Sequence, residues 1–136
     1  MQTFIPYEDI EQSAKVLDYR RLGKQRSECK QILNALYKGG GWKNHPAVKM
    51  WSGYENALTL YMNTVIIEWI RRGYKNNMLL CEVNENDVVY PLWLGDNRFH
   101  ASHRSNLLRK DPKYYGQFGW NEPDNLPYFW PTKEGY

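Results

Sequence analysis

The chain has few residues that could cross-link it or hold a metal. Only two cysteines occur in 136 residues, Cys29 and Cys81, and they form no Cys-x-x-Cys pair. No His/Cys cluster has the spacing of a zinc site. Two isolated thiols are typical of a reducing compartment, so we expect a cytoplasmic protein without a metal. A chain of this length forms one domain, which we expect to comprise residues 1–136.

Long apolar segments are also missing. A membrane helix needs about 20 apolar residues, and the best candidate, residues 57–70, is interrupted by Asn63 and Glu68. The first six residues lack the basic start and apolar core of a signal peptide. Nor is there a P-loop, a GxGxxG fingerprint, a nucleophile elbow or an HExxH motif. We therefore expect no membrane partner, and no common nucleotide-binding or hydrolase motif assigns a reaction.

Aromatic residues are abundant, whereas the net charge is small. Phe, Trp and Tyr make up 15% of the chain, and 18 Lys and Arg face 15 Asp and Glu, which leaves a formal net charge of +3. Such a balance indicates a nucleic-acid partner only where the positive residues cluster. Most of the aromatic rings are expected in the core, because a small domain needs their buried area.

The spacing of apolar residues predicts an all-α fold with three to four main helices. We expect a short helix from Asp9 to Leu17 and longer helices over 19–37, 54–72 and 99–109. Gly23 is expected to break or kink the second helix, because glycine costs about 1 kcal/mol relative to alanine inside a helix. Residues 74–99 and 113–136 are expected to be irregular, with the aromatic residues of the last segment packing it onto the helices.

A first cationic cluster lies at the start of the long helix, in Asp18-Tyr19-Arg20-Arg21-Leu22-Gly23-Lys24-Gln25-Arg26-Ser27-Glu28. At about 100° per residue, one flank of the apolar stripe holds Arg21, Lys24, Gln25 and Glu28. An unused charge beside a buried stripe is costly, and the planar guanidinium of arginine binds two phosphate oxygens at once. The cluster favours phosphate binding, and a merely solvated helix face is the alternative.

A second cluster lies in the helix expected near residue 100. His100, His103 and Arg104 are neighbours at i, i+3 and i+4, accompanied by Ser and Asn donors. Without a third ligand at a recognisable spacing, this pattern favours phosphate binding over a metal site. A plain surface helix is the alternative. His45, in the turn Asn44-His45-Pro46, is a further candidate.

Several short segments carry a resemblance to a known family. They are Thr3-Phe4-Ile5-Pro6-Tyr7, Tyr19-Arg20-Arg21-Leu22-Gly23-Lys24, Asn44-His45-Pro46-Ala47-Val48-Lys49-Met50-Trp51, Arg71-Arg72-Gly73-Tyr74, Trp93-Leu94-Gly95-Asp96, Ser102-His103-Arg104 and Tyr114-Tyr115-Gly116. In this order they resemble the pyrimidine-dimer DNA glycosylases of the phage endonuclease V type, and more closely the bacterial branch of that family.

The resemblance implies an all-α enzyme that flips a base out of damaged or modified double-stranded DNA, removes it and cleaves at the abasic site. In this family the N-terminal α-amine attacks the sugar C1′ and forms a Schiff base, a role that falls here on Met1. An α-amine has a pKa near 8, so more of it is neutral at pH 7 than of a lysine. The family's catalytic Glu corresponds to Arg21, so Glu28 is the candidate carboxylate and Asp18 the second choice. Gln2 disfavours removal of Met1.

The resemblance and the two clusters together assign the DNA contacts to Arg20, Arg21, Lys24, Gln25, Arg26, His45, His103, Arg104, Arg109 and Lys110. We expect no cofactor, and a monomer. Two other functions stay open, namely a DNA-binding module of the same fold without chemistry and an enzyme acting on a nucleotide or modified nucleoside. The glycosylase hypothesis requires the start of the chain, the arginine-rich turn and the histidine–arginine helix to open into one cationic hollow.

Overall fold

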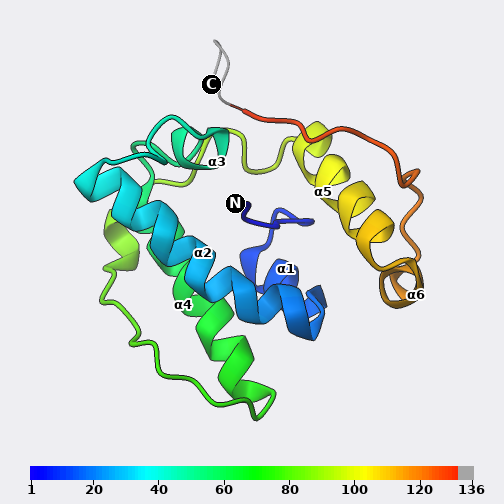
Figure 1. The fold of residues 1–136 in the computed structure, drawn as a ribbon, viewed down its shortest axis with the longest axis horizontal. Coiled ribbons are helices and arrows are strands. Elements are labelled where there is room, and N and C mark those ends of the chain that lie inside the picture. Colours follow the sequence, from blue (N-terminus) through cyan, green and yellow to red (C-terminus); the bar gives the residue numbers. More distant parts are fainter. Residues whose placement is uncertain (132–136) are drawn as a thin grey trace.

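A computed structural model describes residues 1–131, and its regular elements are all helical (Figure 1). They are α1 (Ile10–Val16), α2 (Tyr19–Lys38), α3 (Pro46–Lys49), α4 (Glu55–Arg71), α5 (Asn97–Lys110) and α6 (Pro112–Tyr115), with 3-10 turns at Glu85–Asp87 and Gly116–Phe118. The all-α prediction is confirmed, and the four helices expected from the sequence correspond closely to α1, α2, α4 and α5. The end of the expected tail, residues 132–136, lies outside the described residues.

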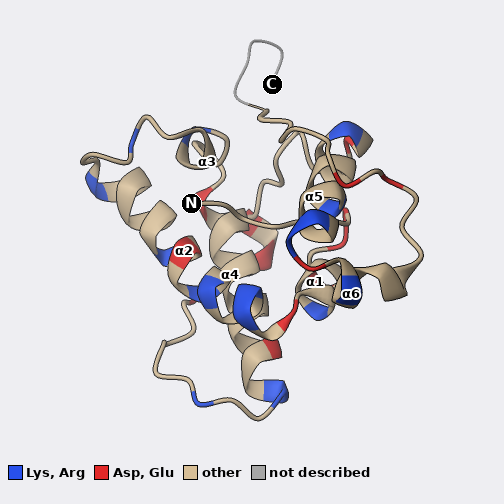
Figure 2. Cartoon of the chain, turned by 45° about the vertical axis from the view of Figure 1, so that its right-hand side comes forward, with Lys and Arg blue, Asp and Glu red and all other residues tan. Residues whose placement is uncertain are grey.

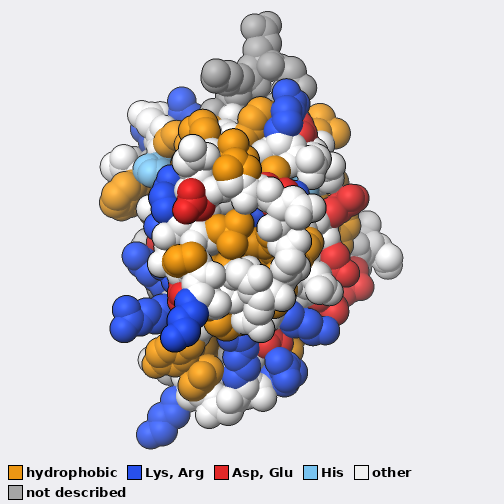
Figure 3. Space-filling model, turned by 90° about the vertical axis from the view of Figure 1, so that its right-hand side faces the viewer, with side chains coloured by type: hydrophobic (Ala, Val, Ile, Leu, Met, Phe, Trp, Pro, Cys, Tyr) orange, Lys and Arg blue, Asp and Glu red, His pale blue; other side chains and the backbone are white. Residues whose placement is uncertain are grey.

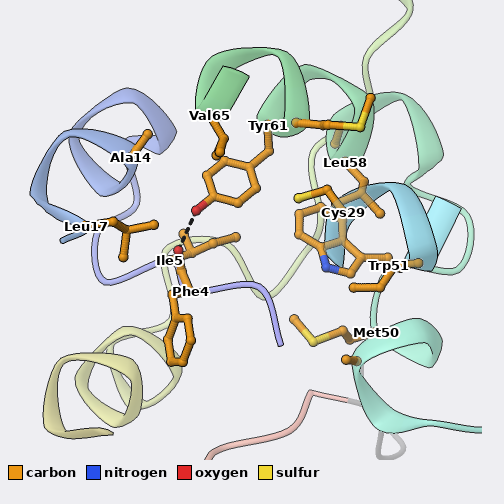
Figure 4. Close-up of a cluster of buried hydrophobic side chains, with 14 of the residues drawn as sticks. Phe4, Ile5, Ala14, Leu17, Cys29, Met50, Trp51, Leu58, Tyr61 and Val65 are labelled. Carbon is orange, nitrogen blue, oxygen red and sulfur yellow. Dashed lines mark hydrogen bonds between the residues drawn. The ribbon is translucent and has the colours of Figure 1, made fainter. Parts of the chain in front are cut away.

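The core forms where α2 crosses α4, and α1 also packs against α4 (Figure 1). Fully buried side chains from α2 and α4 meet there, among them Leu22, Cys29, Ile32, Leu58, Tyr61 and Val65. The N-terminal segment runs into this core, where the hydroxyl of Tyr61 donates to the carbonyl oxygen of Phe4 over 2.5 Å (Figure 4). The first residues of the chain are therefore part of the core rather than a loose end.

α2 continues through Gly23, so the expectation of a break in the helix at this residue is wrong. A Cβ atom at this position would lie 2.9 Å from two ring carbons of Trp69 on α4. The Trp69 ring also stacks on Tyr19 at a centroid distance of 5.5 Å and lies under the guanidinium of Arg26 at 4.3 Å. The glycine thus permits a close approach of the two central helices, a reason that the sequence pattern does not reveal.

The polar face of α5 binds the N-terminal segment. His103 Nδ1 accepts a hydrogen bond from the backbone N–H of Ile5 over 3.0 Å, and His100 Nδ1 lies 2.8 Å from the carbonyl oxygen of Ile5. Because His100 Nε2 accepts from the N–H of Gly95, its proton lies on Nδ1 and is donated to Ile5. Burial lowers the pKa of His103 to about 3. The histidines that we expected to bind phosphate are neutral, and they bind the buried backbone of Ile5 instead.

The same helix also holds residues 119–131, which we call the tail strap. Its backbone is bound by Ser102, Ser105 and Asn106 of α5, through hydrogen bonds with Pro123, Leu126 and Phe129. Arg104 forms an ion pair with Glu122 of the strap at 3.0 Å and donates to the carbonyl oxygen of Pro6 over 2.6 Å. The donors that we expected to bind phosphate are therefore occupied within the molecule by the strap and the N-terminal segment.

Candidate active site at the start of the chain

The position of the first residue is set by one buried side chain of α2. Gln25 Oε1 accepts a hydrogen bond from the N–H of Phe4 over 2.6 Å, and Gln25 Nε2 donates to the carbonyl oxygen of Gln2 over 2.7 Å. Gln25 is 1% exposed. Because both polar ends of this amide are used by the backbone of residues 2–4, Met1 is held at a defined point beside α2.

Met1 lines a cavity of about 420 Å³ that several parts of the chain enclose. The N-terminal segment, α2, the turn before α3, the end of α5 and the tail strap all contribute to it. Its walls consist of Met1, Gln2, Phe4, Arg20, Arg21, Lys24, Glu28, His45, Lys110, Tyr128 and Trp130. The structure thus brings the start of the chain and the arginine-rich turn of α2 together, and within residues 1–131 α5 adds only Lys110.

The other predicted site residues lie outside this cavity. They are Gln25, Arg26, His103, Arg104 and Arg109. Arg26 lies over Trp69 and donates to the side chain of Asn76 over 2.8 Å, and Arg109 donates to the side chain of Asn106. Gln25, His103 and Arg104 hold backbone segments, so their part in any site is to position it.

Glu28 contributes a carboxylate to the cavity next to several positive charges. Its side chain is 12% exposed, and Lys24 Nζ lies 3.9 Å from its Oε1. Burial raises the pKa of Glu28, and this effect outweighs the opposing influence of the Met1 ammonium group, Lys24 and Lys110. Glu28 is therefore a carboxyl group within electrostatic reach of the α-amine that takes up a proton at a higher pH than a free glutamate.

Arg21 is held by a network that the sequence analysis missed. Its guanidinium lies 3.1 Å from both carboxylate oxygens of Asp18. The hydroxyl of Tyr115 donates to Asp18 and accepts from the Asp18 N–H over 3.0 Å. Burial raises the pKa of Asp18, but the hydrogen bonds from Tyr115 and Arg21 outweigh it and leave the pKa lowered. Asp18 thus uses its carboxylate to orient Arg21. Of the two candidate carboxylates, Glu28 has the weaker contact within the molecule, its 3.9 Å ion pair with Lys24.

His45 also lines the cavity, at the start of α3. Its Nδ1 accepts from the N–H of Ala47 over 3.0 Å, so the proton of the neutral ring lies on Nε2. The ring packs in a T-shaped arrangement against Trp42 and against Trp130, at centroid distances of 5.7 and 6.1 Å. Burial and the charge of the Met1 ammonium lower the pKa of His45. The side chain is therefore a neutral hydrogen-bond donor.

Positive charge is concentrated around the cavity. The N-terminus lies between α2 and α5, both of which carry Lys and Arg (Figures 1 and 2). In the view of Figure 3, Lys and Arg gather towards the left and the lower part of the molecule, and Asp and Glu towards its right edge. Burial and the charges of Arg21, Arg109 and Lys24 lower the pKa of Lys110. Cations this close repel one another, and an anionic ligand such as a phosphate backbone relieves the repulsion.

Two classes of site have no counterpart among the described residues. No group of three or more His, Cys, Asp or Glu within residues 1–131 could hold a metal ion. No helix in that part of the chain is long and apolar enough to span a membrane.

The geometry defines a class of protein, a small helical protein that presents the first residue of its chain in a cationic cavity. The model of the pyrimidine dimer DNA glycosylase family matches residues 1–81, and the chain belongs to this family, whose substrate is DNA. The matched part includes α1 to α4 and the cavity residues from Met1 to His45. No curated protein and no solved structure matches the chain. The assignment to the bacterial branch stays a prediction.

Proposed function

We propose that the protein is a glycosylase of damaged DNA that also cleaves at the resulting abasic site, with the α-amine of Met1 as the nucleophile. One observation carries the proposal, the meeting of Met1, Glu28 and four cationic side chains in one cavity. Nucleophile, proton acceptor and phosphate-binding groups are the parts that such a reaction needs. The family match supplies DNA as the substrate.

The first step exchanges the base for the amine. The lone pair of the neutral Met1 amine forms a bond to the sugar C1′ while the glycosidic bond breaks. The base leaves with the electron pair of that bond and takes up a proton. Glu28 accepts the proton that the amine loses, and its negative charge stabilises the positive charge that develops on the sugar. A carboxyl group with a raised pKa suits this exchange.

The second step breaks the strand. The sugar ring opens as Glu28 passes the proton that it accepted in the first step to O4′, which leaves a protonated imine between C1′ and the amine nitrogen and returns Glu28 to its carboxylate form. Loss of a proton from C2′ to Glu28 allows the C3′–O bond to break, and the 3′ phosphate leaves with its electron pair. Water then hydrolyses the imine, and the Met1 amine and a sugar aldehyde are released.

The cationic side chains bind the DNA backbone on either side of the reacting nucleotide. Arg20, Lys24 and Lys110 line the cavity. The guanidinium of Arg20 can bind two phosphate oxygens at once, and the two lysines each supply one positive charge. Arg21 stands where the family has its catalytic Glu and cannot accept a proton. Its pairing with Asp18 fixes the guanidinium in the wall of the cavity, where it binds phosphate in a set orientation.

Borohydride trapping tests the chemistry directly. Duplex DNA with an abasic aldehyde is mixed with the protein and reduced, and we expect one covalent adduct per chain, which peptide mass spectrometry places on Met1. Glu28→Gln should slow trapping by about 100-fold or more. Glu11→Gln, an exposed acid of α1, is the matched control and should trap normally. A Gly-Ser extension before Met1 moves the amine away and should abolish the adduct.

A second candidate is a DNA-binding module that has kept the cavity and lost the chemistry. The presence of Arg21 at the position of the family's carboxylate favours it. The same assay separates the two functions, because this module would bind duplex DNA and give no adduct. Turnover of a mononucleotide together with negligible duplex affinity would contradict both.

A further inference from the structure

The segment that follows α4 exposes apolar side chains to solvent. Leu79 is 85% exposed and Leu80 is 52% exposed. The chain runs here as a drawn-out trace along the edge of the molecule that lies away from α5 (Figure 1). We call residues 78–84 the edge segment. Two neighbouring leucines in water lose the stabilisation that burial gives, and contiguous exposed apolar surface marks a site of contact with another molecule.

The edge segment is fixed on the molecule although it is exposed. The side-chain amide of Asn63 on α4 donates to the carbonyl oxygen of Cys81 over 2.7 Å and accepts from its N–H over 3.0 Å. Just before the segment, Asn76 donates to the carbonyl oxygen of Met78 over 2.7 Å and accepts from Arg26 over 2.8 Å. Because these contacts already order the backbone, a partner that binds it loses less affinity to conformational entropy.

One edge of this backbone is free to pair. Leu79 and Cys81 line a groove of about 590 Å³ against α2 and α4, whereas Leu80 between them does not, as expected of an extended chain. In such a chain the N–H and C=O of successive residues point to opposite edges. Since Cys81 directs both groups to Asn63, Leu80 and Glu82 direct theirs away from α4. No hydrogen bond within residues 1–131 uses the backbone of these two residues, and such an edge is a template for another extended chain.

The charges around the edge segment favour a second copy of this chain as the occupant. Lys75 lies before the segment, and Glu85 and Asp87 lie after it, all three exposed. If two copies pair antiparallel, the lysine of each copy lies next to the acidic residues of the other, whereas parallel pairing brings like charges together. A pairing centred on Cys81 places Lys75 opposite Asp87, so the segment is complementary to itself in one direction.

We infer that the edge segment binds the edge segment of a second copy of this chain, antiparallel and about a two-fold axis at Cys81, to form a dimer. Leu80 of each copy then exchanges backbone hydrogen bonds with Glu82 of the other, and Leu79 packs opposite Val83. The contact is isologous, because the same surface serves both copies. From the sequence we expected a monomer, and the exposed edge segment is the reason for departing from that expectation.

The dimer leaves the Met1 cavity accessible. We call the basic residues that line this cavity the cationic wall, namely Arg20, Arg21, Lys24 and Lys110. Next to the edge segment, α2 lines the groove with Lys30, Leu33, Asn34 and Tyr37. At about 100° per residue, the cavity residues and the groove residues of α2 lie on nearly opposite flanks of the helix. A second copy therefore does not compete with DNA, and each dimer carries two cavities.

Sedimentation velocity of the full chain tests the dimer directly. We expect the mass to rise from that of a monomer to that of a dimer with a Kd of about 1–100 μM, as for a small interface. Leu80→Asp places a negative charge next to Glu82 of the second copy and should weaken association by at least about tenfold. Leu92→Asp, at an exposed leucine outside the edge segment, is the matched control. Circular dichroism melting confirms that each variant is folded.

Charge reversal tests the direction of pairing. Lys75→Glu brings like charges together and should weaken association by about threefold or more. Adding Asp87→Lys to the same chain restores opposite charges in the antiparallel arrangement and should recover most of the loss. In a parallel arrangement each residue faces its own equivalent, so the double variant gives no recovery and contradicts the inferred direction.

The natural thiol of Cys81 tests the two-fold axis. Two residues opposite each other at a non-hydrogen-bonded position lie about 4.5 Å apart at their Cα atoms, which is close enough for a disulfide. Diamide should therefore oxidise two Cys81 thiols to an intermolecular disulfide, whereas Cys29 is buried. Cys81→Ser combined with Glu11→Cys moves the exposed thiol to α1, and cross-linking should then be at least about tenfold slower.

The outcomes decide this inference separately from the proposed chemistry. A chain that stays monomeric up to about 1 mM, or a dimer that neither Leu80→Asp nor Lys75→Glu weakens, overturns self-association through the edge segment. Equal cross-linking of the two thiol positions overturns the axis at Cys81. Leu80→Asp should still give normal borohydride trapping on Met1, because Leu80 lies outside the Met1 cavity. Absence of trapping in the native chain contradicts the proposed function and leaves the dimer to its own tests.

Discussion

The side-chain oxygen of Gln25 accepts a hydrogen bond from the backbone N–H of Phe4 over 2.6 Å, and this contact decides where the chain begins in space. The other end of the same amide donates to the carbonyl oxygen of Gln2. One residue inside α2 thus orients the backbone that leads to Met1. A nucleophile at the end of a chain is otherwise free to move, and proximity catalysis needs it held.

Replacing Gln25 by Ala should therefore affect both stability and chemistry. Two buried backbone groups lose their partners at about 1–3 kcal/mol each, so we expect the free energy of unfolding in urea to fall by about 2–6 kcal/mol. Trapping by the remaining folded protein should slow by at least about tenfold. Gln12→Ala, an exposed glutamine of α1, is the control. Normal trapping by folded Gln25→Ala would contradict the anchoring role.

The raised pKa of Glu28 predicts the acid side of the pH profile. The proposed reaction needs the carboxylate form, so the rate should decline as the pH falls through a value above 4.5, the ordinary pKa of this group. Lys24 lowers that pKa, and Lys24→Gln should move the decline to higher pH. Single-turnover strand cleavage as a function of pH measures both. Lys15→Gln is the reference variant. If Lys24→Gln has the same pH profile as this reference, Glu28 is not the group whose protonation lowers the rate in acid.

The buried histidine of α5 predicts a loss of stability in acid. The pKa of His103 is 6.5 without perturbation and about 3 in the folded chain, so the folded state keeps the ring neutral while the unfolded chain takes up a proton. The stability is complete above about pH 6.5 and declines as the pH falls towards 3, by up to about 1.4 kcal/mol per pH unit.

His103→Asn isolates this contribution, because its side-chain oxygen can still accept from the N–H of Ile5. Urea unfolding at several pH values should show a shallower pH dependence than for the native chain. His100, whose pKa is also lowered by burial, remains in both proteins, so the difference between them belongs to His103. Parallel curves for the two proteins would mean that His103 titrates normally.

The close contact of Gly23 with Trp69 predicts that a substitution that usually stabilises a helix lowers the stability of this protein. Glycine to alanine inside a helix normally stabilises by about 1 kcal/mol, but here the new Cβ would meet the Trp69 ring at 2.9 Å. We expect Gly23→Ala to lower the free energy of unfolding by about 1–3 kcal/mol. Adding Trp69→Leu should recover part of that loss, which a double-mutant cycle measures. Ser27→Ala, exposed on the same helix, should change stability by less than about 0.5 kcal/mol.

The cationic wall predicts how DNA binding depends on salt. Each phosphate contact contributes about 0.9 to the slope of log affinity against log salt concentration for duplex DNA. Lys24→Met and Lys110→Met should each reduce that slope by about 1, measured by fluorescence anisotropy. Lys15→Gln, at the end of α1 and outside the cavity, should leave it unchanged. Equal slopes in all four proteins would place the DNA elsewhere.

Much of the fold was predictable because its signals are local. Apolar spacing outlined the main helices, and Asp9 and Asp96 each accept backbone N–H groups at the start of a helix, which short-range sequence patterns indicate. The resemblance pointed to Met1 and the arginine-rich turn, and both line the cavity. The position of Tyr128 and Trp130 in the lining of the cavity was missed, although alternate rings in an extended, proline-flanked segment are the kind of signal that could have indicated it.

The sequence by itself determined the helices, the all-α class and the concentration of positive charge at the start of α2, because periodicity and capping act within a few residues. Only the tertiary structure decided which face of α5 is buried and which cations are open to a ligand. Those outcomes depend on partners far apart in the chain, such as Ile5 with His103 and Asp18 with Tyr115. The sequence of a polar helix face is the same whether its hydrogen-bond donors are satisfied by water, by a phosphate or by another segment of the backbone. Only the packed fold shows which of these partners they have.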